Sequence, residues 1–301
     1  MFSIAKTSFL NTKLARLFFI YSLANLPACT SSALFFVNEL ARFGNYQVIE
    51  NIAYGPDKLN RLSIYKPDDL SEKKSSVIIF FYGGCWGGCK TFAKEDYLFI
   101  AQALTSYGYI VVLADYRLYP EVKFPQIMDD TGRTVEWVKK NIERHNGDPK
   151  AIFLMGHSAG AHLAAMLTLN EKYLKPETYE SIKGFIGLAG PYDFLPLTKP
   201  YQKAVFGPEE KYPESQPINF VDGAEPPLLL LYGKQDKTVK PHNIKNLAGK
   251  VRQLGGSVET RVYDDLDHTG ILEALTVPLQ NHEPVLSDIV EFIEKNISAQ
   301  L

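Results

Sequence analysis

Residues 151–169 read AIFLMGHSAGAHLAAMLTL, and this stretch decides the fold. The apolar run 151–155 predicts a short buried strand, and the Ala- and Leu-rich residues after Gly160 favour a helix. Between them lies a G-x-S-x-G pattern, typical of a sharp strand-to-helix turn that exposes its serine hydroxyl. Gly156 and Gly160 fit there because the two backbones pass in contact. Ser158 is therefore the candidate nucleophile, and an ordinary glycine turn is the alternative.

A serine hydroxyl needs a base to remove its proton, usually a histidine held in one tautomer by a buried carboxylate. In strand–turn–helix sheets of this kind the partners follow in the order Ser, Asp/Glu, His, each after a strand. Asp236 follows the apolar run 228–232, and His268 follows the predicted strand 258–263. We therefore predict Asp236 as the acid and His268 as the base. The competing carboxylates share the loop of the histidine: Asp264, Asp265 and Asp267.

Five other histidines compete with His268 for the role of base. His157 precedes the candidate nucleophile, and we expect its side chain to point away from it. His162 lies one turn along the following helix and is expected to be packed in the interior. The remaining ones lie at helix ends or past the last catalytic position: His145, His242 and His282.

A glycine-rich segment follows the third predicted strand, FFYGGCWGG at residues 80–88. Acyl transfer through a serine requires backbone amides that stabilise the oxygen of the tetrahedral intermediate. Glycines suit this position because side chains would block the approach of the substrate carbonyl. We predict Gly83, Gly84 and Ala159 as the oxyanion-hole donors, with a flexible glycine turn as the alternative.

Apolar runs alternate with helical patterns across most of the chain. The predicted strands are 46–54, 60–66, 76–82, 109–114, 151–155, 183–188, 228–232 and 258–263. The predicted helices are 97–107, 124–145, 159–169, 243–254 and 284–296. This order predicts a single α/β domain with a mostly parallel, doubly wound sheet and an antiparallel N-terminal hairpin. The proline-rich connection 191–227 is expected to be an irregular binding element rather than a large apolar lid.

Several motifs carry a resemblance to a known family. They are YGGxW at 82–86, DYRL at 115–118, GHSAG at 156–160, PYDF at 191–194 and the Asp236 and His268 loops. Together they resemble the carboxylesterase and acetyl-hydrolase branch of the α/β-hydrolase superfamily, akin to the hormone-sensitive-lipase group. The resemblance covers residues 46–296 and implies an α/β-hydrolase fold and a serine esterase without metal or cofactor.

Tyr82 departs from this family, because many members have a histidine there that orients the oxyanion loop. Tyr82 in place of histidine therefore affects the expected structure of the oxyanion loop more than the expected activity. Asp115 and Arg117, which belong to the DYRL motif, are interpreted as a structural turn and an ion-pair site rather than as catalytic groups.

Residues 1–28 are typical of a secretory signal. Lys6, Lys13 and Arg16 precede the apolar segment LFFIYSLANL at 17–26, and small residues follow. A membrane-spanning helix needs about 20 apolar residues, so this segment is too short for one. We therefore expect export, to the periplasm or as a secreted protein. Residues 29–45 are predicted as a linker or short helix, and 46–301 as the catalytic domain.

The end of the signal, LPAC at 26–29, resembles the bacterial lipobox. Cleavage before Cys29 and lipid attachment to it would tether the protein to a membrane. Pro27 differs from the residue usual at that position, so a plainly cleaved signal and an uncleaved anchor are the alternatives.

The charge balance of 32 Lys+Arg against 34 Asp+Glu gives a net charge of −2, which argues against nucleic-acid binding. Besides Cys29 there are two cysteines, Cys85 and Cys89. Their spacing favours two free thiols, with a disulfide as the alternative in an oxidising compartment. No second Cys/His pair with ligand spacing is present, so no metal site is expected.

These features predict a serine carboxylesterase that hydrolyses small, short-chain acyl esters through an acyl-enzyme. Arylformamidase or another amide hydrolase on the same triad is one alternative, since only the leaving group and pocket differ. A non-catalytic binding protein on a hydrolase scaffold is the other.

Overall fold

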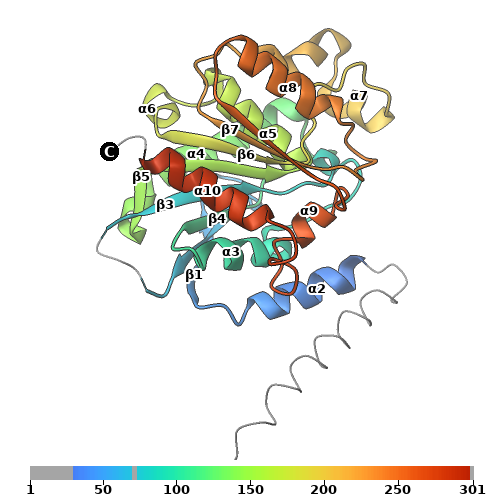
Figure 1. The fold of residues 1–301 in the computed structure, drawn as a ribbon. Helices are drawn as coiled ribbons and strands as arrows, with labels where there is room; N and C mark the ends of the chain where they lie inside the picture. Colours follow the sequence, from blue (N-terminus) through green and yellow to red (C-terminus); the bar gives the residue numbers. More distant parts are fainter. Residues whose placement is uncertain (1–29, 70–72, 299–301) are drawn as a thin grey trace, which may run out of the picture.

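The computed structural model describes residues 30–69 and 73–298, shown in Figure 1. Eight strands form one sheet in the order β1-β2-β4-β3-β5-β6-β7-β8. Their bounds are β1 Tyr46–Ala53, β2 Arg61–Pro67, β3 Ser75–Phe81, β4 Ile110–Ala114, β5 Gly147–His157, β6 Ile182–Leu188, β7 Leu228–Gly233 and β8 Val258–Tyr263. The β1/β2 and β2/β4 pairs are antiparallel, and all the other pairs are parallel. The predicted mostly parallel sheet with an antiparallel N-terminal hairpin is confirmed.

The central strands carry continuous apolar runs because helices cover both of their faces. All five residues of β4 and all six of β7 are buried, whereas the edge strands β1 and β8 remain partly exposed. Parallel strands buried on both faces read as continuous Val, Ile and Leu runs rather than as alternating patterns. The apolar runs in the sequence therefore mark the middle of the sheet.

Helices cover the two faces of the sheet unequally (Figure 1). On one face lie α3 Leu98–Thr105 and α10 Val285–Ser298. On the other face lie α4 Phe124–Asn141, α5 Ala159–Leu169 and α8 His242–Gln253. The N-terminal helix α2, Thr30–Ala41, packs on α3. Every residue of α5 is buried, so the helix that follows Ser158 is fixed from all sides.

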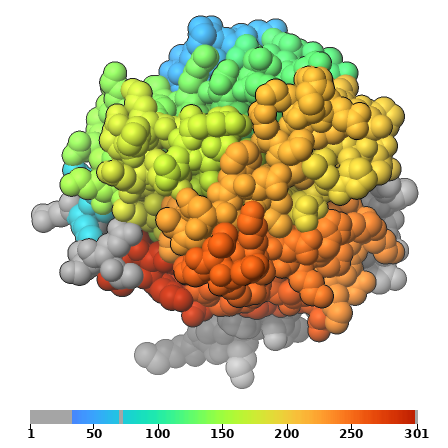
Figure 2. All heavy atoms as spheres, turned by 90° about the horizontal axis from the view of Figure 1, so that it is seen from above, coloured from blue at the N-terminus to red at the C-terminus, as the bar shows by residue number. Residues whose placement is uncertain are grey.

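The expected irregular connection 191–227 contains three short helices. They are α7 Pro200–Phe206, η5 Glu209–Ser215 and η6 Pro217–Phe220. Figure 2 shows its yellow and gold residues on the outside of the molecule, beside the orange residues of α8. η6 packs against α5 and α8, so this connection lies over the helix that carries the nucleophile turn.

Two element boundaries differ from the prediction by four residues. β5 begins at Gly147 instead of residue 151, because Gly147 already pairs with Ser75 of β3. The helix predicted over 124–145 ends at Asn141 and continues as the 3-10 turn η3, Ile142–His145. The remaining short helices are α6 Pro176–Tyr179, α9 Gly270–Glu273, η1 Cys85–Gly87, η2 Lys94–Tyr97 and η4 Glu171–Tyr173.

The predicted signal 1–28 and Cys29 lie outside the described residues. Across 30–69 and 73–298, none of the helices combines the length and the apolar character that a membrane crossing requires.

Candidate active site

Ser158 sits in a strained turn between β5 and α5. Its backbone has φ 53° and ψ −121°, a conformation that non-glycine residues rarely adopt. A Cβ at Gly160 would lie 2.0 Å from the Phe81 carbonyl oxygen, and one at Gly156 would lie 2.4 Å from Gly160. Strand, turn and helix therefore pass within contact of one another, as the sequence pattern predicts. The turn points the serine hydroxyl toward the carboxyl ends of the strands.

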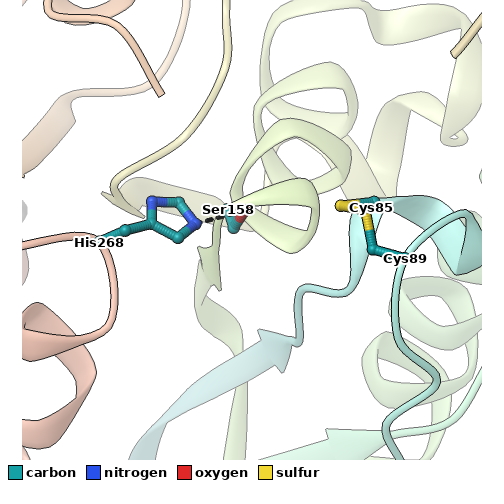
Figure 3. Close-up of a disulfide and its surroundings, with 4 residues drawn as sticks. All are labelled: Cys85, Cys89, Ser158 and His268. Atoms are coloured by element: carbon teal, nitrogen blue, oxygen red, sulfur yellow. Dashed lines mark hydrogen bonds between the residues drawn. A yellow bond between two sulfur atoms is a disulfide. The ribbon is translucent and has the colours of Figure 1, made fainter. Parts of the chain in front are cut away.

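His268 and Asp236 complete a hydrogen-bonded chain with Ser158, and Figure 3 shows the bond between Ser158 and His268. His268 Nε2 lies 2.9 Å from Ser158 Oγ, and His268 Nδ1 lies 2.8 Å from Asp236 Oδ2. A carboxylate only accepts, so Nδ1 carries the proton and Nε2 is free to accept from the serine hydroxyl. The structure thus brings together the three residues that the sequence singled out for the triad, from loops after β5, β7 and β8.

The Asp236 carboxylate is held in its ionised form. Burial alone raises its pKa, but the bond to His268 and the amides of Thr238 and Val239 outweigh burial and keep the pKa below the usual value. Those amides donate to Oδ1 at 2.7 and 2.9 Å, leaving Oδ2 for the histidine. A fixed, charged acceptor orients the imidazole and stabilises its protonated form.

Two of the three competing carboxylates in the loop of His268 have other partners. Asp264 is an exposed residue that pairs with Lys234, and Asp267 accepts from the amides of Thr269 and Gly270 at the start of α9. Chain order had ranked Asp236 above these residues. The structure places only Asp236 at His268 Nδ1 among the described residues.

His157 lies against His268, although we expected its side chain to point away from the nucleophile. The imidazole is 5% exposed, and its Nε2 donates to the main-chain oxygen of His268 at 2.8 Å. The two rings are 4.8 Å apart. Burial, reinforced by the neighbouring His268, lowers the pKa of His157 to about 3, so it stays neutral. The G-x-S-x-G pattern gave no signal for this contact, because the loop of His268 comes from 110 residues further along the chain.

The loop after β3 approaches Ser158 from the other side. A Cβ at Gly83 would come within 3.2 Å of Ser158 Cβ, which is closer than an ordinary contact between such atoms. The Gly83 amide interacts with the buried Tyr97 hydroxyl, and the role of Gly83 as a further oxyanion donor stays a prediction. Among the described residues, the amides of Gly84 and Ala159 donate to no other backbone carbonyl. These two amides are therefore available to an external oxygen.

Cys85 and Cys89 form a disulfide, so the expectation of two free thiols is wrong. The turn of η1 between them folds the chain back and brings their Cα atoms to 5.3 Å, within the range that a disulfide spans. Spacing along the sequence did not show this turn, because it depends on four consecutive residues with positive φ: Gly84, Cys85, Trp86 and Gly87. Figure 3 shows Ser158 between His268 and this disulfide.

Tyr82 occupies the interior behind the oxyanion loop. Its ring stacks on Tyr97 and Tyr116, and its hydroxyl donates to Asp115 Oδ1 at 3.2 Å. Asp115 also pairs with the buried Lys94 at 2.9 Å. Arg117 makes a bidentate contact with the buried Asp130. Asp115 and Arg117 thus lie in ion pairs and away from the serine, consistent with a structural role.

Within residues 30–69 and 73–298, no group of three His, Cys, Asp or Glu side chains is arranged to hold a metal ion.

Residues 62–251, more than half of the chain, match the model of the BD-FAE family. The chain belongs to the BD-FAE family. The predicted place in the α/β-hydrolase superfamily is thereby confirmed.

This BD-FAE family member is similar to several curated esterases. It is 28% identical over 276 residues to an isoprenylcysteine alpha-carbonyl methylesterase of Arabidopsis thaliana, covering 83% of this chain and 63% of the relative. It is 25% identical over 236 residues to esterase LipC of Mycobacterium tuberculosis, covering 72% of this chain and 58% of that protein. The chain therefore spans less than two thirds of the length of these relatives.

Solved structures show the same fold as this BD-FAE protein. A carbohydrate esterase from gut microbiota superposes with a TM-score of 0.71 at 20% identity, covering 84% of this chain and 98% of that one. Esterase 2 of Thermogutta terrifontis superposes with a TM-score of 0.69 at 23% identity, covering 83% and 94%. At this level of identity the likeness concerns the α/β-hydrolase fold.

Proposed function

We propose that this protein is a serine carboxylesterase with Ser158 as nucleophile, His268 as base and Asp236 as the orienting acid. The observation that carries the proposal is the unbroken chain from Ser158 Oγ to His268 Nε2 at 2.9 Å and from His268 Nδ1 to Asp236 at 2.8 Å. Relatives of the chain are named esterases, which supports an ester rather than another acyl substrate.

The mechanism has two acyl-transfer steps. His268 Nε2 takes the Ser158 proton while Oγ bonds to the ester carbonyl carbon, whose oxygen becomes negative. The Gly84 and Ala159 amides donate to that oxygen, and Gly83 contributes the space that a side chain would fill. The carbon–alkoxy bond then breaks, and the alkoxide leaves with the proton from His268. Water repeats the sequence on the acyl-enzyme, releasing the carboxylic acid and restoring Ser158.

We expect the substrate to be a small ester with a short acyl chain. The 191–227 connection supports this, because it consists of short helices, of which η6 packs against α5 and α8, and does not form a large apolar lid. p-Nitrophenyl esters of graded acyl length measure the preference, and we expect kcat/KM to fall as the acyl chain lengthens. The matched p-nitroanilides test for amide hydrolysis, and higher kcat/KM on the anilides would overturn the ester assignment.

Ser158→Ala tests the nucleophile. We expect kcat/KM for p-nitrophenyl acetate to fall by about 10⁴-fold or more, since the triad acts as a unit, while the thermal unfolding midpoint changes little. Ser287→Ala is the matched control, because Ser287 is an exposed serine on α10. A fluorophosphonate should label wild type and Ser287→Ala but not Ser158→Ala. Substantial activity in Ser158→Ala, or wild type that takes up no label, would contradict the proposal.

We also propose that the protein is exported through residues 1–28 and that Cys29 carries lipid. The basic start, the apolar segment 17–26 and the LPAC ending support this proposal. The Cys85–Cys89 disulfide agrees with an oxidising compartment. Mass spectrometry of the mature N-terminus tests it, since an unmodified Cys29 or a retained signal would exclude lipidation.

A further inference from the structure

The side chain of Trp86 leaves the oxyanion loop and enters the interior. It is 4% exposed and packs against three aromatic rings: His162, Phe194 and Phe206. Phe194 and Phe206 belong to the connection 191–227, and His162 belongs to α5. Trp86 thus connects the oxyanion loop to α5 and to the connection 191–227.

The contact between Trp86 and His162 is a directed hydrogen bond. Trp86 Nε1 donates to His162 Nδ1 at 3.0 Å, and His162 Nε2 lies 2.7 Å from the main-chain oxygen of Ser215. An indole nitrogen only donates and a carbonyl only accepts, so His162 accepts at Nδ1 and donates from Nε2. The ring is completely buried, and burial lowers the pKa of His162 to about 4, which preserves this neutral tautomer.

The backbone at Cys85 and Trp86 has an unfavourable conformation. Cys85 and Trp86 have φ values of 56° and 57°, in the left-handed region that is unfavourable for residues with a Cβ. Two side-chain constraints oppose relaxation: the Cys85–Cys89 disulfide and the Trp86–His162 bond. In addition, Tyr119 donates its amide to the Trp86 carbonyl at 3.0 Å.

We propose that His162 is a positioning residue that acts through Trp86, with the Cys85–Cys89 disulfide as a second constraint, to hold the Gly83–Gly84 segment against Ser158. The inference rests on the proposed esterase function and concerns how the oxyanion hole is kept in place. His162 lies four residues after the nucleophile on the same helix. A single rigid helix therefore fixes both the attacking oxygen and the loop that stabilises the resulting charge.

Three variants of the full chain test the proposal: His162→Phe, Trp86→Phe and the pair Cys85→Ser with Cys89→Ser. Removing one oxyanion donor from an acyl-transfer site costs about 10²–10³-fold in kcat, and a displaced donor costs less. We expect His162→Phe and Trp86→Phe to lower kcat about 30-fold with KM changed less than about 3-fold, and the cysteine pair to lower kcat about 10-fold. His162→Asn, which retains one acceptor and one donor, should recover part of the loss.

A trifluoromethyl ketone separates positioning from general damage. Ser158 adds to its carbonyl carbon, the serine proton passes to His268, and the adduct oxygen becomes negative where the oxyanion forms. We expect the inhibition constant to rise in parallel with the loss of kcat/KM, because such analogues depend on the same stabilisation as the transition state. Partial unfolding would instead lower the number of active sites titrated by fluorophosphonate without changing the inhibition constant.

Thr168→Val is the matched control, since Thr168 is a buried polar residue on α5 that bonds Ala164 and lies away from the loop. It should keep kcat within about 2-fold. Unchanged kcat and inhibition constant in folded His162→Phe and Trp86→Phe would overturn the inference. Wild type without Ser158-dependent hydrolysis would instead reject the proposed function itself.

Discussion

Two strained turns meet at the candidate active site: the nucleophile turn, residues 156–160, and the oxyanion loop, residues 83–89. They are stabilised in different ways. At the nucleophile turn, Gly156 and Gly160 lie in contact, and the Ser158 amide donates to the Leu188 carbonyl at the end of β6 at 2.9 Å. At the oxyanion loop, Cys85 and Trp86 are held by a disulfide and by His162, which lies 76 residues away. Backbone contacts with the strands of the sheet therefore hold the nucleophile turn, whereas side-chain contacts hold the oxyanion loop.

The two turns also differ in how closely they are packed against the core of the domain. The nucleophile turn lies between the central strands and the fully buried α5. A substitution that deforms this turn would therefore also displace the strands and the helix of the core. The oxyanion loop lies at the surface end of β3, where Lys90 and Thr91 are exposed. Disturbing the first turn should unfold the domain, whereas disturbing the second should lower activity in a folded domain.

Gly160→Ala should have the largest effect on stability. The added Cβ would lie 2.0 Å from the Phe81 oxygen and 2.4 Å from the Tyr82 oxygen, both in the backbone at the end of a central strand. We expect a loss of about 4 kcal/mol or more in the free energy of unfolding, at the upper end for single substitutions. Urea denaturation measures it, and a loss below about 1 kcal/mol would show that the turn can relax.

Gly84→Ala should act mainly on catalysis. Gly84 has φ 112°, and a Cβ would lie 2.3 Å from the carbonyl oxygen of Lys90, within the same surface loop. We expect kcat/KM to fall about 10²-fold, as for the loss of one oxyanion donor, while the domain stays folded. Ester kinetics and thermal unfolding on one preparation separate the two effects. A destabilisation equal to that of Gly160→Ala would contradict the distinction between the two turns.

Acid should destabilise the two regions through one buried histidine each. Burial lowers the pKa of His157 to about 3 and that of His162 to about 4, below the ordinary histidine value of 6.5. Below pH 6.5 the unfolded chain binds protons that the folded chain excludes, so stability falls as pH falls. Each should contribute a loss of about 2 kcal/mol between pH 6.5 and 4.5.

The variants His157→Asn and His162→Asn separate these contributions. Urea denaturation at pH 4.5, 5.5 and 6.5 should show a shallower pH dependence in each, by about 1 kcal/mol per pH unit. An unchanged dependence in one variant would mean that its histidine already titrates normally in the folded protein. The depressed pKa of Asp236 contributes separately, because its stabilisation is lost only in more acidic solution.

Gly249→Ala should have the smallest effect, and in the opposite direction. Gly249 is exposed within α8, and a Cβ there would meet nothing within 4 Å. Alanine in a helix interior should raise the free energy of unfolding by about 0.5–1 kcal/mol and leave ester hydrolysis unchanged. A loss of stability would show that the glycine effects at the two turns do not arise from local crowding alone.

The sheet was predictable because its signals are local. Apolar runs such as 228–232 mark strands buried on both faces, and each candidate triad residue follows such a run or its turn. Chain order then distinguished Asp236 from Asp264 without any structure. The disulfide and the contacts of His157 could not be predicted in this way, since they depend on loop geometry and on residues distant in sequence.

The sequence by itself determined the α/β-hydrolase sheet, the nucleophile turn and the residues that meet as Ser158, Asp236 and His268. Parallel strands end at one edge, so residues placed after them converge whatever the details of the loops. Only the tertiary structure decided how the oxyanion loop is held, with Trp86 bonded to His162 and Cys85 to Cys89. Left-handed backbone at residues with a Cβ is unfavourable locally, so it persists only where surrounding contacts enforce it.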